Sequence, residues 1–139
     1  MKQFHATTIQ IDGKGVMLCG PSASGKSDLG IRLIENGAIL VADDRTDITL
    51  NNNKILASAP KEIFGKMEVR GLGIITLDAV VKTHLTIVVE LVNSIAIERH
   101  PTKKNINLLG VTLPLIHLYA FEASASAKIR RSLIHHSQT

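Results

Sequence analysis

Residues 20–27 read Gly-Pro-Ser-Ala-Ser-Gly-Lys-Ser, and this stretch decides the fold that we expect. Its spacing, Gly-x4-Gly-Lys-Ser, is that of a phosphate-binding loop, the P-loop or Walker A motif. An apolar run at 16–19 precedes it, and leucines at helical spacing follow it in residues 28–36, so the order is strand, loop, helix. Backbone N–H groups of such a loop, together with the helix dipole, bind phosphate. The candidate nucleotide-binding residues are Gly20, Pro21, Ser22, Ala23, Ser24, Gly25, Lys26 and Ser27.

The composition limits what can surround this loop. With 139 residues, 45% hydrophobic and 20% charged, we expect one globular P-loop domain over residues 1–139 and no intrinsic disorder. Aromatic residues make up only 3%, which disfavours an RNA-binding platform based on stacking. The net charge of +4 fits a nucleotide or an acidic protein as well as nucleic acid. A single cysteine, Cys19, indicates a reducing, cytoplasmic compartment, and no apolar segment approaches the ~20 residues of a membrane span. We therefore expect neither nucleic acid nor a membrane as partner.

The rest of the chain is rich in strand patterns. Short apolar or alternating runs predict strands at residues 4–11, 16–19, 38–42, 46–50, 55–59, 67–77, 84–92 and 113–118. Helix patterns occur at residues 28–36 and 123–136. We expect an α/β P-loop domain with a β-rich mixed sheet and few helices, and we favour a pair of packed sheets over a doubly wound layer.

Two adjacent acids, Asp43 and Asp44, close the apolar run 38–42. We expect this run to be a parallel strand beside the strand that precedes the P-loop, which would place both carboxylates across the phosphate site. A carboxylate in that place either holds Mg²⁺ through water or acts on the attacking group. The alternative is a polar turn at the end of a strand.

Three segments in this order resemble the catalytic domain of HPr kinase/phosphorylase: the P-loop, Leu-Val-Ala-Asp-Asp at 40–44, and Met-Glu-Val-Arg-Gly-Leu-Gly-Ile-Ile at 67–75. The third is similar to that family's signature, Glu-hydrophobic-Arg-Gly-Leu-Gly-Ile. The resemblance runs from about His5 to Pro114 and implies the P-loop fold of the HPr kinase/PEP carboxykinase type. It also implies the use of ATP and Mg²⁺ to phosphorylate a seryl residue of HPr, the phosphocarrier protein of the bacterial sugar phosphotransferase system. A cytoplasmic hexamer that regulates carbon metabolism, with phosphorolysis as a reverse reaction in many members, is implied as well.

The resemblance assigns roles to the matching residues. Lys26 would bind phosphate, and Ser27 and Glu68 would be the Mg²⁺ ligands. Asp43 would be the general base that accepts the seryl proton, and Asp44 would support the metal and its waters.

Two further catalytic residues, His5 and Arg99, are implied by their spacing from the family's motifs. Without the resemblance, His5 would be a half-buried polar residue of a strand and Arg99 a solvated loop arginine. Arg70 would either stabilise the transferring phosphoryl charge or pair with Glu68. Supporting positions in the signature are Gly71 and Gly73.

The chain departs from the family pattern in several places. Ala23 stands where glycine is usual, and Ala6 replaces the glycine that usually follows the upstream histidine. Alanine tolerates a positive φ poorly, at a cost of about 1 kcal/mol or more. Leu-Ile-His-Leu-Tyr-Ala at 115–120 replaces a basic segment tied to phosphorolysis, which favours the kinase direction. The family's usual N-terminal domain has no counterpart, so the chain resembles the short alphaproteobacterial form.

Two other functions fit the motifs less well. A small-molecule or nucleotide kinase usually needs lid and acceptor-binding insertions, for which this chain is too short and too β-rich. A nucleotide-binding regulatory protein with little catalysis would leave Asp43, Glu68 and His5 without a role.

Overall fold

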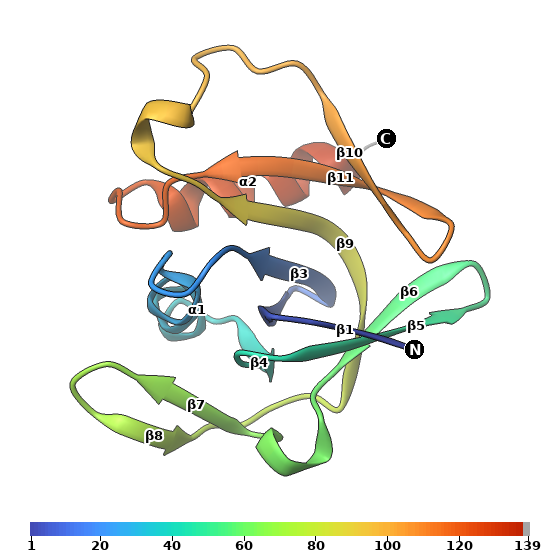
Figure 1. Ribbon diagram of the computed structural model, residues 1–139, viewed down its shortest axis with the longest axis vertical. Helices are drawn as coiled ribbons and strands as arrows, with labels where there is room; N and C mark the ends of the chain where they lie inside the picture. The colour runs from blue at the N-terminus through green and yellow to red at the C-terminus, as the bar shows by residue number, and fades with distance from the viewer. Residues whose placement is uncertain (138–139) are drawn as a thin grey trace.

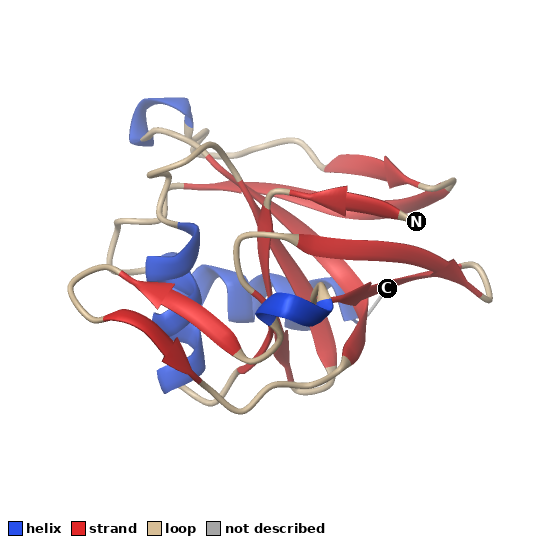
Figure 2. Ribbon diagram, turned by 60° about the horizontal axis from the view of Figure 1, so that its bottom comes forward, coloured by secondary structure: helices blue, strands red, loops and turns tan. Residues whose placement is uncertain are grey.

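The computed structural model describes residues 1–137, and strands dominate it (Figure 1, Figure 2). The strands are β1 (Lys2–Phe4), β2 (Ala6–Ile11), β3 (Lys14–Cys19), β4 (Ile39–Ala42), β5 (Thr46–Asn51), β6 (Lys54–Ser58), β7 (Lys66–Val69), β8 (Gly73–Thr76), β9 (Lys82–Leu91), β10 (Lys104–Leu108) and β11 (Val111–Leu118). The helices are α1 (Lys26–Glu35) and α2 (Ala125–Ser137), and short 3-10 turns occur at η1 (Lys61–Ile63) and η2 (Ser94–Ala96). The expected α/β fold with a mixed sheet and few helices is confirmed.

The main sheet is continuous and strongly bent. Its order is β1-β5-β6-β9-β3-β2-β4, and the β10–β11 hairpin joins it through β11 and β9. β9 pairs antiparallel with β6 through residues 82–84, and its later residues pair in parallel with β3 and β11. Figure 1 shows β9 curving between these two sets of partners. The two packed sheets that we expected are thus two parts of one sheet that bends along β9.

Both faces of the central strands are buried. Because successive side chains in a strand point to opposite faces, Val16 and Leu18 of β3 enter the core beneath α1 and α2. Met17 enters a second core, where it packs with Ile48 of β5 and Ile55 of β6. Burial on both faces explains the unbroken apolar run 87–89 in β9, where Ile87 and Val89 enter the first core and Val88 the second. None of the helices in residues 1–137 is long and apolar enough to cross a membrane.

The position that we expected for β4 is wrong. β4 does not pair with β3, because β2 lies between them and is antiparallel to both. Asp12 and Gly13 have φ values of 50° and 80°, as in the tight two-residue turns of β-hairpins. This turn makes β2 and β3 neighbours in the sheet. β4 therefore pairs with the other edge of β2. It still runs in the direction of β3, so the two strands end on the same side of the molecule.

β10 was not predicted, and β1 was not separated from β2, because the run 4–11 was expected as one strand. The apolar residues of β10, Ile106 and Leu108, alternate with Asn105 and Asn107, so the period-two signal is present but short. The partner strand β11 completes a hairpin with β10. This hairpin lies at the upper right of the molecule in Figure 1.

Candidate active site

The glycine-rich loop, Gly20–Ser27, lies at one edge of the sheet. It joins β3 to α1, and β3, β9 and β11 are parallel, so their carboxyl ends meet at this edge (Figure 1). Ligands of α/β proteins characteristically bind outside the carboxyl ends of parallel strands. The topology therefore places the predicted phosphate-binding residues where a ligand site is expected.

Packing around the loop requires glycine at two positions. A Cβ on Gly25, where φ is 97°, would lie 2.7 Å from the Cβ of Ala120. One on Gly20 would lie 2.6 Å from the Oγ of Ser24. Ala23 has a φ of 66°, which confirms that alanine occupies a left-handed position at this point of the loop.

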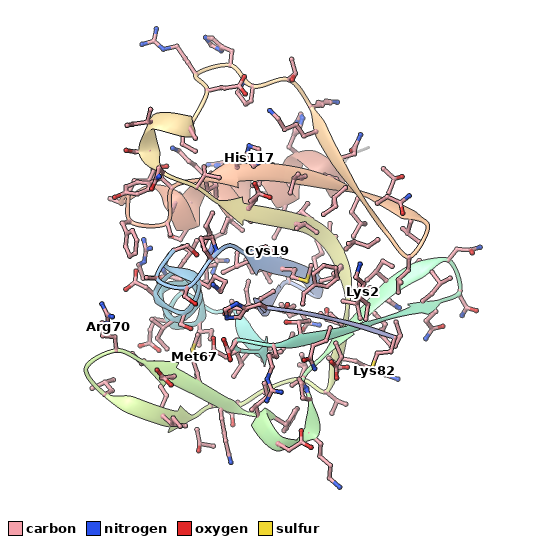
Figure 3. All side chains as sticks on the ribbon, in the orientation of Figure 1. Lys2, Cys19, Met67, Arg70, Lys82 and His117 are labelled. Carbon is pink, nitrogen blue, oxygen red and sulfur yellow. The ribbon has the colours of Figure 1, made fainter. Side chains whose placement is uncertain are left out.

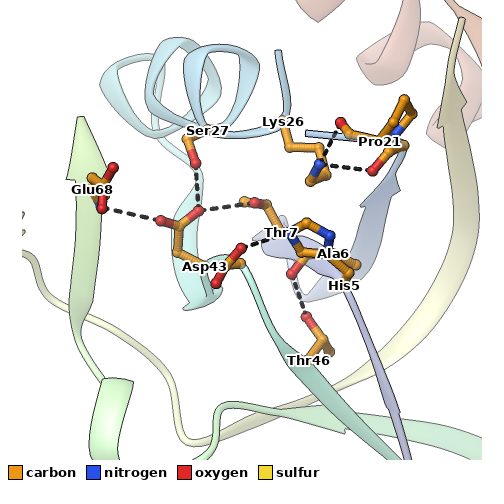
Figure 4. A network of polar contacts seen from close by, with 11 residues as sticks. His5, Ala6, Thr7, Pro21, Lys26, Ser27, Asp43, Thr46 and Glu68 are labelled. Atoms are coloured by element: carbon orange, nitrogen blue, oxygen red, sulfur yellow. Dashed lines mark hydrogen bonds and ion pairs between the residues drawn. The ribbon is translucent and has the colours of Figure 1, made fainter. Parts of the chain in front are cut away.

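Lys26 begins α1 and folds back over the loop. Its Nζ donates hydrogen bonds to the carbonyl oxygens of Gly20, at 2.7 Å, and Pro21, at 2.9 Å (Figure 4). Burial lowers the pKa of Lys26, while the nearby carboxylates of Asp44 and Asp43 oppose that shift. An ammonium group has three N–H donors, so one remains for a ligand oxygen.

Asp43 is the centre of a buried polar network, shown in Figure 4. Its Oδ1 accepts hydrogen bonds from Ser27 Oγ, at 2.7 Å, and from Thr7 Oγ1, at 2.9 Å. Its Oδ2 accepts the backbone N–H of Glu68 at 3.1 Å. Asp43 is only 5% exposed. The carboxylate thus joins α1, β2 and β7, and both of its oxygens already have donors.

Asp44 has a different environment from its neighbour. Its φ is 68°, and the N–H of Arg45 donates to the carbonyl of Asp43 at 2.7 Å, which closes a three-residue turn around Asp44. Such turns with a positive central φ are rare and strained, and strain of this kind concentrates at functional sites. Asp44 Oδ1 lies 2.7 Å from Nε2 of His5, and these two side chains are 65% and 50% exposed. The structure therefore brings His5 to an accessible carboxylate.

The β7–β8 hairpin is fixed to α1 by Met67. A Cβ on Gly30 of α1 would lie 2.9 Å from Met67 Cε, so the two elements meet closely, and Met67 points toward α1 in Figure 3. This contact delivers the N–H of Glu68 to Asp43. The side chain of Glu68 is exposed, and within residues 1–137 no three His, Cys, Asp or Glu residues form a metal-binding group. Mg²⁺ usually takes one or two carboxylates plus phosphate and water, so Ser27 and Asp43 fit a metal bound together with phosphate. Glu68 contacts this network through its backbone N–H.

Two predicted arginines lie apart from this network. Arg70 is exposed at the outer end of the β7–β8 hairpin (Figure 3) and, among the described residues, forms no ion pair with Glu68. Gly71, with a φ of 92°, belongs to the turn of that hairpin, and Gly73, with a φ of 88°, is the first residue of β8. Arg99 lies between η2 and β10, where it lines a cavity of about 720 Å³ with residues of β11 and α2.

Sequence reasoning missed one member of the network, Thr7. It is fully buried and donates to Asp43. Only the correct strand order, with β2 beside β4, could have identified it. Cys19, by contrast, takes no part: burial, with a smaller effect of Glu90, raises its pKa to about 11, so the thiol stays protonated at neutral pH.

The fold and these contacts define a class: an α/β domain with a mixed sheet, few helices and a lysine-bearing glycine-rich loop beside two acids. Residues 1–135 match the family model described as the HPr Serine kinase C-terminal domain. The chain belongs to this family.

Individual relatives support this family assignment. The HPr kinase/phosphorylase of Prosthecochloris aestuarii is 35% identical over 133 residues, which covers 84% of this chain and 38% of that protein. The protein of the same name from Malacoplasma penetrans is 41% identical over 96 residues, or 64% of this chain and 32% of that protein. The solved structure of the Hpr(Ser) kinase/phosphatase from Coxiella burnetii matches with a TM-score of 0.86 and 26% identity over 99% of this chain and 97% of that one. The chain thus spans less than two fifths of the length of these two curated relatives.

Proposed function

We propose that this chain is the catalytic domain of an ATP- and Mg²⁺-dependent protein kinase that phosphorylates a seryl residue of HPr. The relatives named HPr kinase/phosphorylase and the Coxiella burnetii structure support this substrate. The observation that carries the proposal is the hydrogen bond from Ser27 to Asp43, with the Asp44–His5 pair beside it. It supports a metal-binding group and a base at the same end of the glycine-rich loop.

Lys26 and Ser27 bind the nucleotide phosphates in this proposal. Lys26 keeps its bonds to the loop carbonyls and gives its third N–H to a phosphate oxygen. The Ser27 hydroxyl donates a hydrogen bond to Asp43. The lone pairs of its oxygen are therefore directed away from Asp43 and are free for a cation. Mg²⁺, when bound, supplies charge neutralisation of the transferring phosphoryl group, and Ser27 and Asp43, with Glu68 beside them, are the residues to hold it.

We assign the general base to Asp44 rather than to Asp43, which exchanges the roles implied by the sequence resemblance. Asp43 is only 5% exposed, so a serine on another protein cannot reach it. Its three donors leave one lone pair, on Oδ2, for a small cation. Asp44 is accessible, and His5 holds its Oδ1. Its second oxygen, Oδ2, can then accept the seryl proton as the hydroxyl attacks phosphorus.

The cellular context is part of the proposal. Family resemblance supports a cytoplasmic homo-oligomer, a hexamer. Leu72 and Ile74 on the β7–β8 hairpin are 73% and 70% exposed, which supports an apolar contact between subunits. Light scattering on the purified chain tests this; a monomer at all concentrations would contradict it.

The decisive experiment is phosphorylation in vitro. The protein is incubated with ATP, Mg²⁺ and HPr from the same cell, and mass spectrometry locates the phosphate. We expect phosphoserine on HPr, no product after chelation of the metal, and little reversal when inorganic phosphate is added. Phosphate transfer to a nucleoside, or ATP turnover without phosphoserine, would instead support a nucleotide kinase or a regulatory ATP-binding protein.

A pair of lysine variants provides the control. Lys26→Met should reduce transfer by roughly 10²-fold or more, because it removes a cation from the developing phosphoryl charge. Lys54→Met changes an exposed lysine of β6, outside the network, and should leave the rate unchanged.

A further inference from the structure

A second concave surface borders the glycine-rich loop, on the side opposite Asp43. We propose that it is the binding site for the nucleobase of the donor nucleotide, which packs against Tyr119 and Phe121. This inference rests on the proposed function, because it assumes that the loop binds a nucleoside triphosphate.

The hollow has a volume of about 440 Å³ and three walls. The first wall is the loop itself, residues 21–24. The second is the end of β9 and the last residue of η2, Ala96, with Asn93 between them. The third is the segment after β11, with Tyr119 and Phe121. A hollow of this size can contain a purine base and its ribose.

The direction of a bound nucleotide follows from the two sides of the loop. Asp44 must face the γ-phosphate, because the acceptor hydroxyl attacks that phosphorus. Lys26 and Ser27 place the phosphate chain at the start of α1. The nucleoside end must then leave on the side away from Asp43 and Asp44. In Figure 1 the loop and the start of α1 lie between β7 on one side and the β11–α2 connection on the other, and the hollow is on the β11–α2 side.

The aromatic wall has the chemistry that a base requires. Tyr119 and Phe121 are two of only four aromatic residues in the chain, and their rings meet edge to face at 5.8 Å. Phe121 is 54% exposed, which is costly for a ring unless something covers it. A Cβ on Gly25 would lie 3.0 Å from Phe121 Cζ, so this ring touches the loop directly. Every base has a π face that can stack on such a ring.

This wall is anchored to α1. Arg32 donates hydrogen bonds to the carbonyl oxygen of Ala120 and, at 3.3 Å, to that of Glu122. The N–H of Val92 donates to the carbonyl of Leu118 at 2.9 Å, which joins the second wall to the third. Because these bonds hold the backbone on both sides of the rings, the hollow exists before a ligand binds. The exposed side-chain amide of Asn93 lies at its rim, where it can donate to or accept from the edge of a base.

Calorimetric titration with two ligands tests the inference. ADP carries a base and inorganic tripolyphosphate does not, while both can bind to the loop. We expect Phe121→Ala to weaken ADP binding about tenfold and to leave tripolyphosphate binding unchanged. Phe64→Ala, which changes an exposed phenylalanine outside the hollow, is the matched control and should change neither.

The outcomes separate the two proposals. Equal ADP affinity in Phe121→Ala and the parent protein overturns the nucleobase site. Equal weakening of both ligands also overturns it, because the ring would then act only on the loop. If the parent protein binds neither ligand and does not phosphorylate HPr, the proposed function fails instead.

A second measurement needs no variant. Tyr119 is the only tyrosine and the chain has no tryptophan, so tyrosine emission reports this residue alone. We expect ADP, but not tripolyphosphate, to change that emission after correction for the light that adenine absorbs. Identical responses to the two ligands would overturn the proposal.

Discussion

The two sides of the glycine-rich loop are built differently. The acidic side, with His5, Asp43 and Asp44, is a network of hydrogen bonds between 2.7 and 3.1 Å around a buried carboxylate. The aromatic side, with Tyr119 and Phe121, offers exposed ring surface and no comparable polar network in its wall residues within 1–137.

This difference matches what each side has to do. Phosphoryl transfer depends on positions held to within about half an ångström, which hydrogen bonds from several elements can provide. Stacking of a base tolerates small displacements, because it needs only a flat apolar surface. The groups of the acidic side are thus held in place by hydrogen bonds between residues far apart in the sequence. The base needs only an exposed ring surface, on which small displacements are tolerated.

The largest expected effect is on the acidic side, in Asp44→Asn. An amide cannot accept the seryl proton, so we expect transfer to HPr to fall about 10²- to 10⁴-fold, with affinity for Mg-ADP unchanged. Initial rates and calorimetry measure the two quantities. Asp47→Asn, on β5, is the control and should keep full activity. Normal turnover in Asp44→Asn, combined with lost turnover but normal binding in Asp43→Asn, would restore Asp43 as the base.

Asp43→Asn should act on binding and stability instead. An amide has one oxygen and one NH₂ group, so it cannot accept from Ser27, Thr7 and the Glu68 N–H together. We expect the free energy of unfolding to fall by about 1–3 kcal/mol and the enhancement of nucleotide binding by Mg²⁺ to be lost. Urea unfolding and titration with and without metal measure these effects. Asp78→Asn, an exposed acid after β8, should change neither, and a stable variant with full metal dependence would contradict the network.

Gly25→Ala tests the point where the two sides meet. Its methyl group would contact Ala120 on the aromatic side and force a left-handed φ on alanine in the loop. We expect a loss of about 1–3 kcal/mol in stability and at least tenfold weaker binding of both ADP and tripolyphosphate. Gly37→Ala has a similar φ, 104°, but open space around it, so it isolates the backbone cost. Equal effects of the two substitutions would show that the contact with Ala120 is unimportant.

The smallest effect is expected from Ala23→Gly. Glycine removes the strain at φ 66°, so the free energy of unfolding should rise by about 0.5–1 kcal/mol. Ala127→Gly, at an exposed position in α2, should lower it by a similar amount because helix interiors disfavour glycine. Thermal or urea unfolding measures both. A destabilised Ala23→Gly variant would mean that the alanine makes a contact worth more than its strain.

Much of the fold was predictable because its signals are local. The turn at Asp12 and Gly13, the loop 20–27 and the helix after it each depend on neighbouring residues. Of the segments expected as strands, all contain strands, whereas β10 escaped because only Ile106 and Leu108 carried its pattern. The strand order was not predictable in this way, and β4 was placed beside the wrong partner.

The residues of the candidate site were likewise predictable only where the signal lies in a local motif. Motif spacing alone identified Lys26, Ser27 and the acid pair, and the resemblance added His5 and Glu68. Thr7 and the aromatic wall were found only in three dimensions. Arg99, expected to be catalytic, lies outside the network. Arg70, expected either to stabilise the phosphoryl charge or to pair with Glu68, lies outside it as well.

The sequence by itself determined which groups can bind phosphate and which can take a proton, because residue type and local spacing set side-chain chemistry and backbone conformation. The tertiary structure decided which acid is buried and which is accessible. Asp43 and Asp44 are adjacent and chemically identical, and they differ only because β2, α1 and β7 supply donors to the first while His5 meets the second. Those donors come from residues 16 to 39 positions away, and only the pairing of distant strands and helices brings them together.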